Sequence, residues 1–292
     1  MASPSPVGMI GLGLMGTALA ARLIEAGMPV IGFDIDATKR KSFGGEAAAS
    51  AEEMIARCRT VAIAVFNAAQ VEAVLDCFYK SNSAHLVICT TTCAPDEILR
   101  LSNRAAQLHL HFAEAPISGT SAEVRAGSAM ALIAGEDATI KAAASVLDIL
   151  CPRQTRLSRI GDAARTKLAI NLVLQNNRAA LAEGIAFAES LGLDGQAFLA
   201  SLRESAAYSR VMDTKAEKML ARDFTAQSHI AQTLKDAELI LEEAQRTKQH
   251  LPMTLVQAGL LRAAINLAGS DADSAAVIEA IRPSRVPSGA ST

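Results

Sequence analysis

The stretch Val7-Gly8-Met9-Ile10-Gly11-Leu12-Gly13-Leu14-Met15-Gly16 joins a short apolar run to three glycines spaced G-x-G-x-x-G. A helix-prone segment, residues 17–26, follows and stops at Gly27. In this spacing the first glycine permits a tight turn, the second lets a pyrophosphate approach the backbone, and the third lets the helix pack against the strand. The free N–H groups that begin the helix then face the phosphates. The stretch therefore predicts a dinucleotide site rather than a plain turn. Its expected lining is Gly11, Leu12, Gly13, Leu14, Met15 and Gly16.

The composition limits the classes of protein that this chain can belong to. Its 292 residues suffice for two domains, half of them are hydrophobic, and the absence of Trp beside only two Tyr favours closely packed helices. A net charge of −2 with mixed signs gives no basis for binding nucleic acid or an anionic membrane. We see neither a signal peptide nor a bilayer-spanning run. The five cysteines do not have the spacing of a zinc site. We therefore expect a cytoplasmic protein with reduced thiols and no metal site.

The first half of the chain alternates short apolar runs with helix-like segments, which is typical of a doubly wound α/β domain. The runs are uninterrupted and β-branched, as expected for parallel strands covered on both faces. Helix-like segments such as 69–77 and 95–107 fill the gaps. We therefore predict a Rossmann domain over residues 1–160. Its expected strands are 7–10, 30–33, 61–65, 86–89, 111–113 and 130–134.

After residue 160 only helical periodicity remains. Residues 163–191 read as one long helix, ending at Gly192, that joins the two domains. We predict an all-helical substrate and oligomerisation domain over residues 161–282. The Pro/Ser/Gly-rich tail, 283–292, is expected to be disordered. The other expected helices are 195–204, 209–221, 230–248 and 253–268.

Asp34 ends the second expected strand, about 20 residues after the glycines, where such folds place an acidic residue. A carboxylate there accepts hydrogen bonds from the adenosine ribose hydroxyls and repels a 2′-phosphate. Ile35 comes next, so no arginine stands at that position to hold such a phosphate. The pattern favours NAD over NADP. Lys39, Arg40 and Lys41 keep NADP open, although a solvated helix start explains them too.

Two polar residues follow expected strands at the carboxyl edge of the sheet, where ligands of such sheets bind. Asn67 comes after the third strand and Thr91 after the fourth. Both are candidates to contact the nicotinamide half of the cofactor. Asn and Thr are also ordinary helix caps, so the residues alone leave both explanations open.

The segment Glu114-Ala115-Pro116-Ile117-Ser118-Gly119-Thr120-Ser121 combines a fixed turn with small polar residues. Pro116 fixes the turn, the Ser118 hydroxyl can donate a hydrogen bond, and Gly119 lets backbone N–H groups come near a ligand. Such a cluster suits a carboxylate. A β-turn rich in small residues explains the segment equally well.

Lys167 and Asn171 stand four residues apart on the long helix, and therefore on one face. Because most of that helix is apolar, burial would push the lysine toward losing its proton and make it a usable general acid or base. A lysine whose amine reaches solvent is the commoner outcome and is favoured from these residues alone. On a later helix, Lys235-Asp236 is either an anion-binding pair or an exposed charge pair of little energy.

Four motifs in order make the chain resemble the β-hydroxyacid dehydrogenase family, which includes 3-hydroxyisobutyrate dehydrogenase and tartronate semialdehyde reductase. They are the GLGLMG turn at 11–16, the A-P-I-S-G segment at 115–119, the Gly161…Lys167…Asn171 stretch, and Leu234-Lys235-Asp236. The resemblance extends from Val7 to Arg282, and four ordered motifs are far more specific than any one of them.

The resemblance implies a role for each motif. The first motif binds the dinucleotide. The lysine matched by Lys167 is the proton donor and acceptor, which overrides the surface-lysine explanation, and the asparagine matched by Asn171 orients the substrate. The lysine matched by Lys235 closes the site over substrate and cofactor. The residues matched to the substrate carboxylate are Ser118, Gly119 and Thr120.

The activity that the resemblance implies is hydride transfer between NAD and the alcohol carbon of a small hydroxy acid. It also implies a dimer or tetramer built on a helical domain like that of 6-phosphogluconate dehydrogenase. Segments 67–75 and 273–278 look most like the L-threonate dehydrogenase branch, which acts on four-carbon sugar acids. Two alternatives stay open, an NADPH-dependent reductase of a small aldehyde or keto acid and a non-catalytic dinucleotide-binding scaffold.

Three positions depart from the family pattern. Glu114 stands where the family usually has Asp, Thr120 replaces the second glycine of S-G-G, and Ala163 replaces a glycine of G-x-G-x-x-x-K. Thr120 keeps its backbone N–H but adds a branched side chain, so we expect a smaller or reshaped substrate pocket. Imine reductases share the architecture but generally lack the lysine, so Lys167 argues against that assignment.

Overall fold

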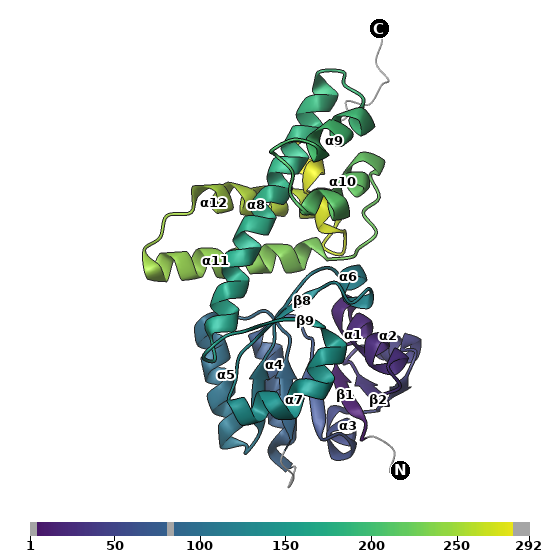
Figure 1. The fold of residues 1–292 in the computed structure, drawn as a ribbon, viewed down its shortest axis with the longest axis vertical. Coiled ribbons are helices and arrows are strands. Elements are labelled where there is room, and N and C mark those ends of the chain that lie inside the picture. Colours follow the sequence, from purple (N-terminus) through teal and green to yellow (C-terminus); the bar gives the residue numbers. More distant parts are fainter. Residues whose placement is uncertain (1–4, 81–84, 283–292) are drawn as a thin grey trace. The chain divides into compact units, whose positions relative to one another are not determined.

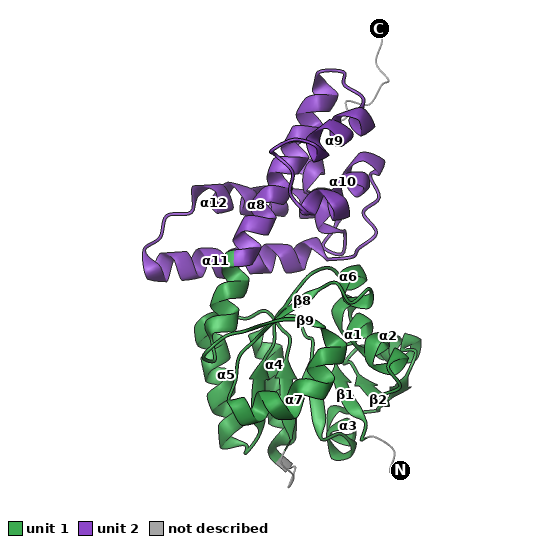
Figure 2. Cartoon of the chain, in the orientation of Figure 1, with its two compact units in different colours: residues 1–169 green, residues 170–292 purple. Residues whose placement is uncertain are grey.

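The structure, a computed structural model, describes residues 5–80 and 85–282. The chain forms two compact units, Met1–Ala169 and Ile170–Thr292 (Figure 2). The domain boundary expected after residue 160 falls inside the first unit and stays a prediction. The tail at 283–292, expected to be disordered, lies outside the described residues.

The first unit is built on a six-stranded parallel sheet in the order β3-β2-β1-β4-β5-β6. From β1 the chain winds outward through β2 and β3, then returns to the other side of β1 with β4. Val7 of β1 pairs with both Val30 and Thr60. This reversal of strand order confirms the doubly wound fold, and ligands of such sheets bind beyond the carboxyl ends of the strands at that point. The strands are β1 (Val7–Ile10), β2 (Val30–Phe33), β3 (Glu46–Ala47), β4 (Thr60–Ile63), β5 (Leu86–Cys89) and β6 (His111–Glu114).

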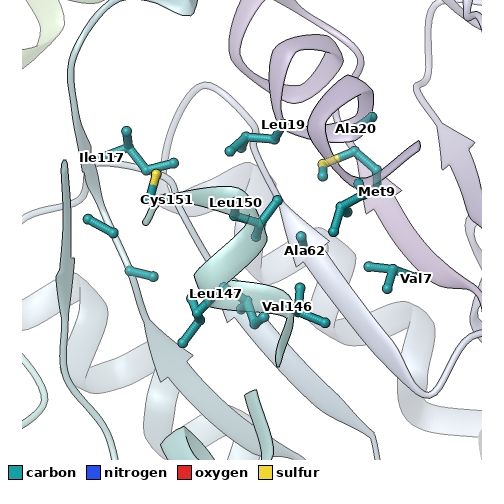
Figure 3. Packing of buried hydrophobic residues seen from close by; sticks show 14 of the residues in the cluster. Val7, Met9, Leu19, Ala20, Ala62, Ile117, Val146, Leu147, Leu150 and Cys151 are labelled. Carbon is teal, nitrogen blue, oxygen red and sulfur yellow. The ribbon is translucent and has the colours of Figure 1, made fainter. Parts of the chain in front are cut away.

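Helices cover both faces of this sheet, which explains why its central strands β1, β2, β4 and β5 are mainly apolar. One face packs against α1 (Leu14–Glu25), α6 (Ser121–Arg125) and α7 (Asp137–Leu150). Figure 3 shows Met9 and Ala62 among side chains that include Leu19 and Leu150. The other face packs against α3 (Ala51–Arg57), α4 (Ala68–Asp76) and α5 (Pro95–Gln107), while α2 (Ala37–Ser42) and the 3₁₀ helix η1 (Cys77–Lys80) complete the unit.

The sixth expected strand belongs to a separate sheet. β8 (Met130–Ile133) lies between β7 (Ile117–Ser118), its antiparallel neighbour, and β9 (Arg153–Arg156), which runs parallel to it. β9 has the sequence RQTR and is exposed throughout, so it carries no apolar signal. This small sheet fixes the backbone at Ser118, the first residue of the expected carboxylate site.

The second unit is helical, as predicted. Helix α8 (Asp162–Ser190) begins in the first unit and continues through 29 residues (Figure 1). Among the described residues no strand follows β9, although His229 and Asp273 form an isolated bridge. No described helix is both long and apolar enough to cross a membrane. The remaining elements are α9 (Gly195–Arg203), α10 (Val211–Ala221), α11 (Ile230–Thr247), α12 (Pro252–Ala268) and the 3₁₀ helix η2 (Ser274–Ala280).

The interior of the helical unit contains polar side chains beside its apolar core. Leu181, Leu199, Met219 and Leu261 form part of the apolar cluster. Buried polar groups are costly unless they are paired, so the partners of each one matter for function. These polar residues are Asn171, Gln175, Arg178, Lys215, Thr233, Asp236, Thr254, Gln257, Asp273 and Ser274.

Candidate active site

The glycine turn leaves the start of α1 open to a ligand. Gly11 has φ +91°, and a Cβ there would lie 2.3 Å from the Ala64 carbonyl oxygen, so only glycine fits. A Cβ on Gly16 would lie 1.7 Å from the Gly11 carbonyl oxygen. At Gly13, by contrast, no described atom outside Gly13 and its two chain neighbours lies within 4 Å of the Cβ position, and no side chain caps the helix at this N-cap. The uncapped N–H groups and the open space suit a phosphate group.

The Asp34 side chain is hydrogen-bonded to this turn. Its Oδ2 accepts a hydrogen bond from the Leu12 N–H at 2.7 Å, its Oδ1 accepts one from the Asp36 N–H at 2.9 Å, and the residue is 8 % exposed. Two cations are nearby, because Lys39 Nζ lies 4.0 Å from Oδ2 and Arg40 Nη1 donates to the Asp34 carbonyl at 2.6 Å. The carboxylate therefore stands at the end of β2 as predicted, with more positive charge around it than the sequence pattern suggested.

The two loop residues have structural partners of different kinds. Asn67 caps α4, since its side chain accepts a hydrogen bond from the Gln70 N–H at 3.0 Å. Thr91 is not a helix cap, because the N-cap of α5 is Ala94. The buried Thr91 hydroxyl instead accepts from the Val65 N–H at 3.1 Å and joins the loops after β4 and β5. Their contact with the cofactor stays a prediction.

Part of the segment expected to bind a substrate carboxylate already binds a carboxylate of the protein itself. Ser118 ends β7, and among the described residues its hydroxyl has no hydrogen-bond partner. Thr120 caps α6 in a capping box with Glu123. The Glu123 carboxylate accepts the Thr120 backbone N–H at 2.9 Å and its hydroxyl at 3.2 Å. The Thr120 N–H, which we expected to be available to substrate, is therefore already donated within the chain.

Glu114 fixes the start of the helix that carries the lysine. Its buried carboxylate, at the end of β6, accepts hydrogen bonds from the N–H groups of Gly161 and Ala164. A carboxylate at a helix N-terminus is favourable. Burial raises the pKa of Glu114 to about 7, and the two backbone hydrogen bonds oppose this only in part. The longer side chain at this departure from the family pattern thus ties the parallel sheet to α8.

This raised pKa predicts a pH-dependent stability. The pKa of Glu114 in the folded protein lies above its ordinary value of 4.5. Between pH 4.5 and 7 the folded protein therefore keeps a proton on Glu114 that the unfolded chain has lost. The folded state loses stability as the pH rises through this range. Relative to Glu114→Gln, the wild type should lose about 3 kcal/mol of unfolding free energy across this range. Urea unfolding followed by circular dichroism at several pH values measures it. Glu136→Gln, at an exposed carboxylate of the same unit, should follow the wild type. Parallel curves for wild type and Glu114→Gln would contradict the assignment.

Lys167 lies in the second turn of α8 and is 5 % exposed. This burial disagrees with the explanation of a lysine whose amine reaches solvent. Asn171, one helical turn further along, is also 5 % exposed. The helix therefore presents a buried amine and a buried amide from the same face.

In the helical unit a carboxylate holds Asn171. Its Nδ2 donates to Oδ2 of Asp236 on α11 at 2.8 Å, which leaves the amide oxygen as the acceptor that Asn171 can offer elsewhere. Lys235 Nζ lies 2.9 Å from Oδ1 of Asp236, and the two side chains are only 14 % and 10 % exposed. The alternative of an exposed charge pair at Lys235-Asp236 is therefore wrong. Buried Asn171 and Asp236 therefore form one group with the partly buried Lys235.

Sequence inspection missed three features of this region. The Thr120–Glu123 capping box has the visible signature T-x-x-E before a helix. The role of Asp236 as the partner of Asn171 depends on contact between residues 65 positions apart, for which a single sequence gives no signal. Nor does it signal the buried Lys215–Asp273 ion pair, whose Nζ–Oδ1 distance is 2.7 Å.

Comparisons with known proteins agree with this fold. Residues 6–157 match the NAD-binding domain of 6-phosphogluconate dehydrogenase, and residues 161–281 match the NAD-binding domain of NADP-dependent 3-hydroxyisobutyrate dehydrogenase. Fold, glycine turn and matches define an NAD(P)-dependent oxidoreductase. The chain belongs to the β-hydroxyacid dehydrogenase family.

Individual relatives match along almost their full length. The chain is 27 % identical to 2-hydroxy-3-oxopropionate reductase of Escherichia coli, over 94 % of the chain and 96 % of the relative. It is 29 % identical to L-threonate dehydrogenase of Cupriavidus necator, over 94 % and 95 %. The crystal structure of 3-hydroxyisobutyrate dehydrogenase from Salmonella typhimurium superimposes with a TM-score of 0.85 at 26 % identity, covering 94 % of this chain and 99 % of that one.

Proposed function

We propose that this oxidoreductase oxidises the alcohol carbon of a small hydroxy acid, with a three- or four-carbon sugar acid as substrate and Lys167 as general acid and base. The burial of Lys167 one turn before Asn171 carries the proposal, because an amine shielded from water at a fixed position can exchange a proton with a bound hydroxyl. The named activities of the relatives, 2-hydroxy-3-oxopropionate reductase and L-threonate dehydrogenase, support the substrate class.

Each group of residues has a task in this mechanism. The free Ser118 hydroxyl and the backbone at Gly119 bind the substrate carboxylate, and the Thr120 N–H takes part only if Glu123 releases it. The Asn171 amide oxygen, set by Asp236, accepts a hydrogen bond from the substrate. Lys167 removes the hydroxyl proton during oxidation and returns it during reduction. NAD(P), when bound, supplies the hydride chemistry.

A substrate panel tests the proposal. Three- and four-carbon hydroxy acids are assayed with NAD⁺ and with NADP⁺, and the corresponding aldehydes and keto acids with both reduced cofactors, by absorbance of the reduced nicotinamide. We expect turnover of at least one hydroxy acid with NAD⁺. A complete absence of turnover beside measurable cofactor binding would instead support the non-catalytic scaffold.

The cofactor preference is proposed to be NAD, set by the Asp34 charge. Asp34→Asn keeps an oxygen to accept the Leu12 N–H but removes the negative charge that repels a 2′-phosphate. We expect the ratio of kcat/KM for NAD⁺ to that for NADP⁺ to fall about tenfold, equivalent to about 1.4 kcal/mol. Asp36→Asn, the matched change at the exposed cap of α2, should leave the ratio within twofold. An unchanged ratio in Asp34→Asn would refute this role.

One observation favours the NADPH-dependent alternative. Lys39 and Arg40 both lie against the end of β2, and a 2′-phosphate would meet their charges there. A wild type that prefers NADP and reduces aldehydes or keto acids in the panel would support that alternative.

We further propose a cytoplasmic homodimer or homotetramer. Apolar side chains that are more than half exposed lie on two helices of the helical unit, and such surface is commonly covered in an assembly. They are Val173 and Phe187 on α8, and Met253, Leu255, Val256 and Leu267 on α12.

A further inference from the structure

The residues that would ordinarily cap the helix carrying Lys167 have no polar side chains. α8 starts at Asp162, and the Gly161 carbonyl accepts its first helical hydrogen bond, from the Arg165 N–H, so Gly161 is the N-cap. The first N–H groups of a helix are usually satisfied by side chains of the N-cap residue and of the residue three positions later. Here these residues are Gly161 and Ala164. Both are buried, so their N–H groups need acceptors from elsewhere in the protein.

Glu114 supplies both acceptors from outside the helix. Its Oε2 accepts the Gly161 N–H at 2.7 Å, and its Oε1 accepts the Ala164 N–H. In a capping box the same two N–H groups are satisfied by two side chains of the helix itself. Here one carboxylate, 47 and 50 positions earlier in the chain, takes both places, and Glu114 is 1 % exposed. The start of α8 is therefore fixed to the end of β6.

The backbone of Glu114 is fixed in turn by the small sheet. Its N–H donates to the Ala134 carbonyl and its carbonyl accepts from the Ala134 N–H, both at 2.9 Å, directly after β8. Ser118 follows four positions after Glu114 and pairs with Met130 of β8. Glu114 therefore joins the segment that carries Ser118 to the helix that carries Lys167. All of these residues belong to the first unit.

We propose that Glu114 is a positioning residue, whose carboxylate holds the first turn of α8, and with it the Lys167 amine, at a fixed place relative to Ser118. The inference rests on the proposed function, in which Ser118 binds the substrate carboxylate and Lys167 exchanges the proton of the hydroxyl. Lys167 follows Ala164 by three positions, so the two are neighbours on one face of the helix. A first turn released from Glu114 would let the amine shift, and a misplacement of about 1 Å can cost about 100-fold in rate.

Replacing the carboxylate by an amide tests this role. Glu114→Gln keeps the length of the side chain but offers one acceptor oxygen, so one of the two N–H groups would face an NH₂ donor. At a pH well above 7, where the wild-type carboxylate is ionised, we expect kcat for the hydroxy acid to fall roughly 10- to 100-fold. The Kd for NAD should not change, because β1 and α1 form the glycine turn. Glu114→Asp keeps both acceptor oxygens on a shorter side chain and should recover part of the lost activity.

A matched control and a double-mutant cycle separate positioning from a merely structural effect. Glu53 holds the start of α3 by accepting the Ala49 N–H at 2.8 Å, and Glu53→Gln should turn over like the wild type. In a Lys167→Ala background, Glu114→Gln should lower kcat by less than about twofold further, because the group that it positions is gone. The same loss in both backgrounds would overturn the proposal. So would a Glu114→Asp variant no more active than Glu114→Gln.

Amide hydrogen exchange, measured by mass spectrometry, does not need turnover and distinguishes failure of this inference from failure of the proposed function. The Gly161 and Ala164 N–H groups lie where the helix itself provides no acceptor. In Glu114→Gln we expect at least one of them to exchange about tenfold faster, while Glu53→Gln leaves this segment unchanged. Unchanged exchange in Glu114→Gln would overturn the inference, even if the enzyme turns over a hydroxy acid. Faster exchange in a protein that turns over no hydroxy acid would support the link between Glu114 and α8 and count against the proposed function.

Discussion

Lys167→Ala should lower kcat for hydroxy-acid oxidation by about 10²- to 10⁴-fold, the usual contribution of a positioned general acid or base. Lys167 is 5 % exposed and one turn from Asn171, so bulk solvent has little access to the position that its amine occupies. Binding of NAD should be unaffected, because the glycine turn and Asp34 are formed by other segments of the chain. Initial rates and cofactor titration by fluorescence measure the two quantities separately.

A second variant separates the proton-transfer role of Lys167 from its positive charge, and a third serves as a control. Lys167→Arg keeps the positive charge but cannot release a proton at neutral pH, so it should be nearly as inactive as Lys167→Ala. Lys141→Ala, at an exposed lysine of α7, should turn over like the wild type. Turnover of Lys167→Ala within a few-fold of the wild type would rule out the acid–base role and leave the lysine as a substrate-binding group at most.

Asp273→Asn should destabilise the chain by about 3–5 kcal/mol, the usual effect of breaking a buried ion pair. Asp273 is fully buried, and Lys215 is 1 % exposed. The carboxylate accepts from Lys215 Nζ at 2.7 and 2.9 Å and from three backbone N–H groups, which join α10, the segment before α11 and η2. Burial lowers the pKa of Lys215 to about 8 even though the charge of Asp273 raises it, so an unpaired Lys215 would be more strongly disfavoured as a cation.

Urea or thermal unfolding of the full chain measures this loss of stability. Lys215→Met should destabilise as well, while the double variant should lose less than the sum because it leaves no buried charge unpaired. Glu217→Gln is the control on the same helix, since its pair with Arg203 is exposed and worth at most about 1 kcal/mol. A loss below about 1 kcal/mol in Asp273→Asn would show that the pair does not hold the helical unit together.

The fold was predictable from sequence where burial leaves a periodic signal. Strands covered by helices on both faces must be apolar, so β1, β2 and β5 were found with their exact bounds. β9 is exposed and polar, and β3 has only two residues, so neither differs from a loop by composition. β8 was found, but its assignment to a second sheet depends on pairing with β7 and β9, which local pattern does not encode.

The candidate site was predictable from sequence where a feature depends only on residues close together in the chain. The glycine turn and the spacing of Lys167 and Asn171 depend on neighbouring residues alone. The burial of Lys167 was not predictable from its helix, because an apolar helix accommodates a lysine equally well with its amine in solvent. Likewise, Arg178 resembles any helical arginine in the sequence, although the structure buries it and leaves its Nε and Nη1 without a hydrogen-bond partner among the described residues.

A crystal structure with NAD⁺ and a hydroxy acid would test the central claim most directly. The measured quantity is the distance from Lys167 Nζ to the substrate hydroxyl, whose carbon must face C4 of the nicotinamide. We predict hydrogen-bond contact at about 3 Å, with the Asn171 amide still donating to Asp236. A substrate bound with its hydroxyl on another group, and the lysine amine turned into solvent, would contradict the account.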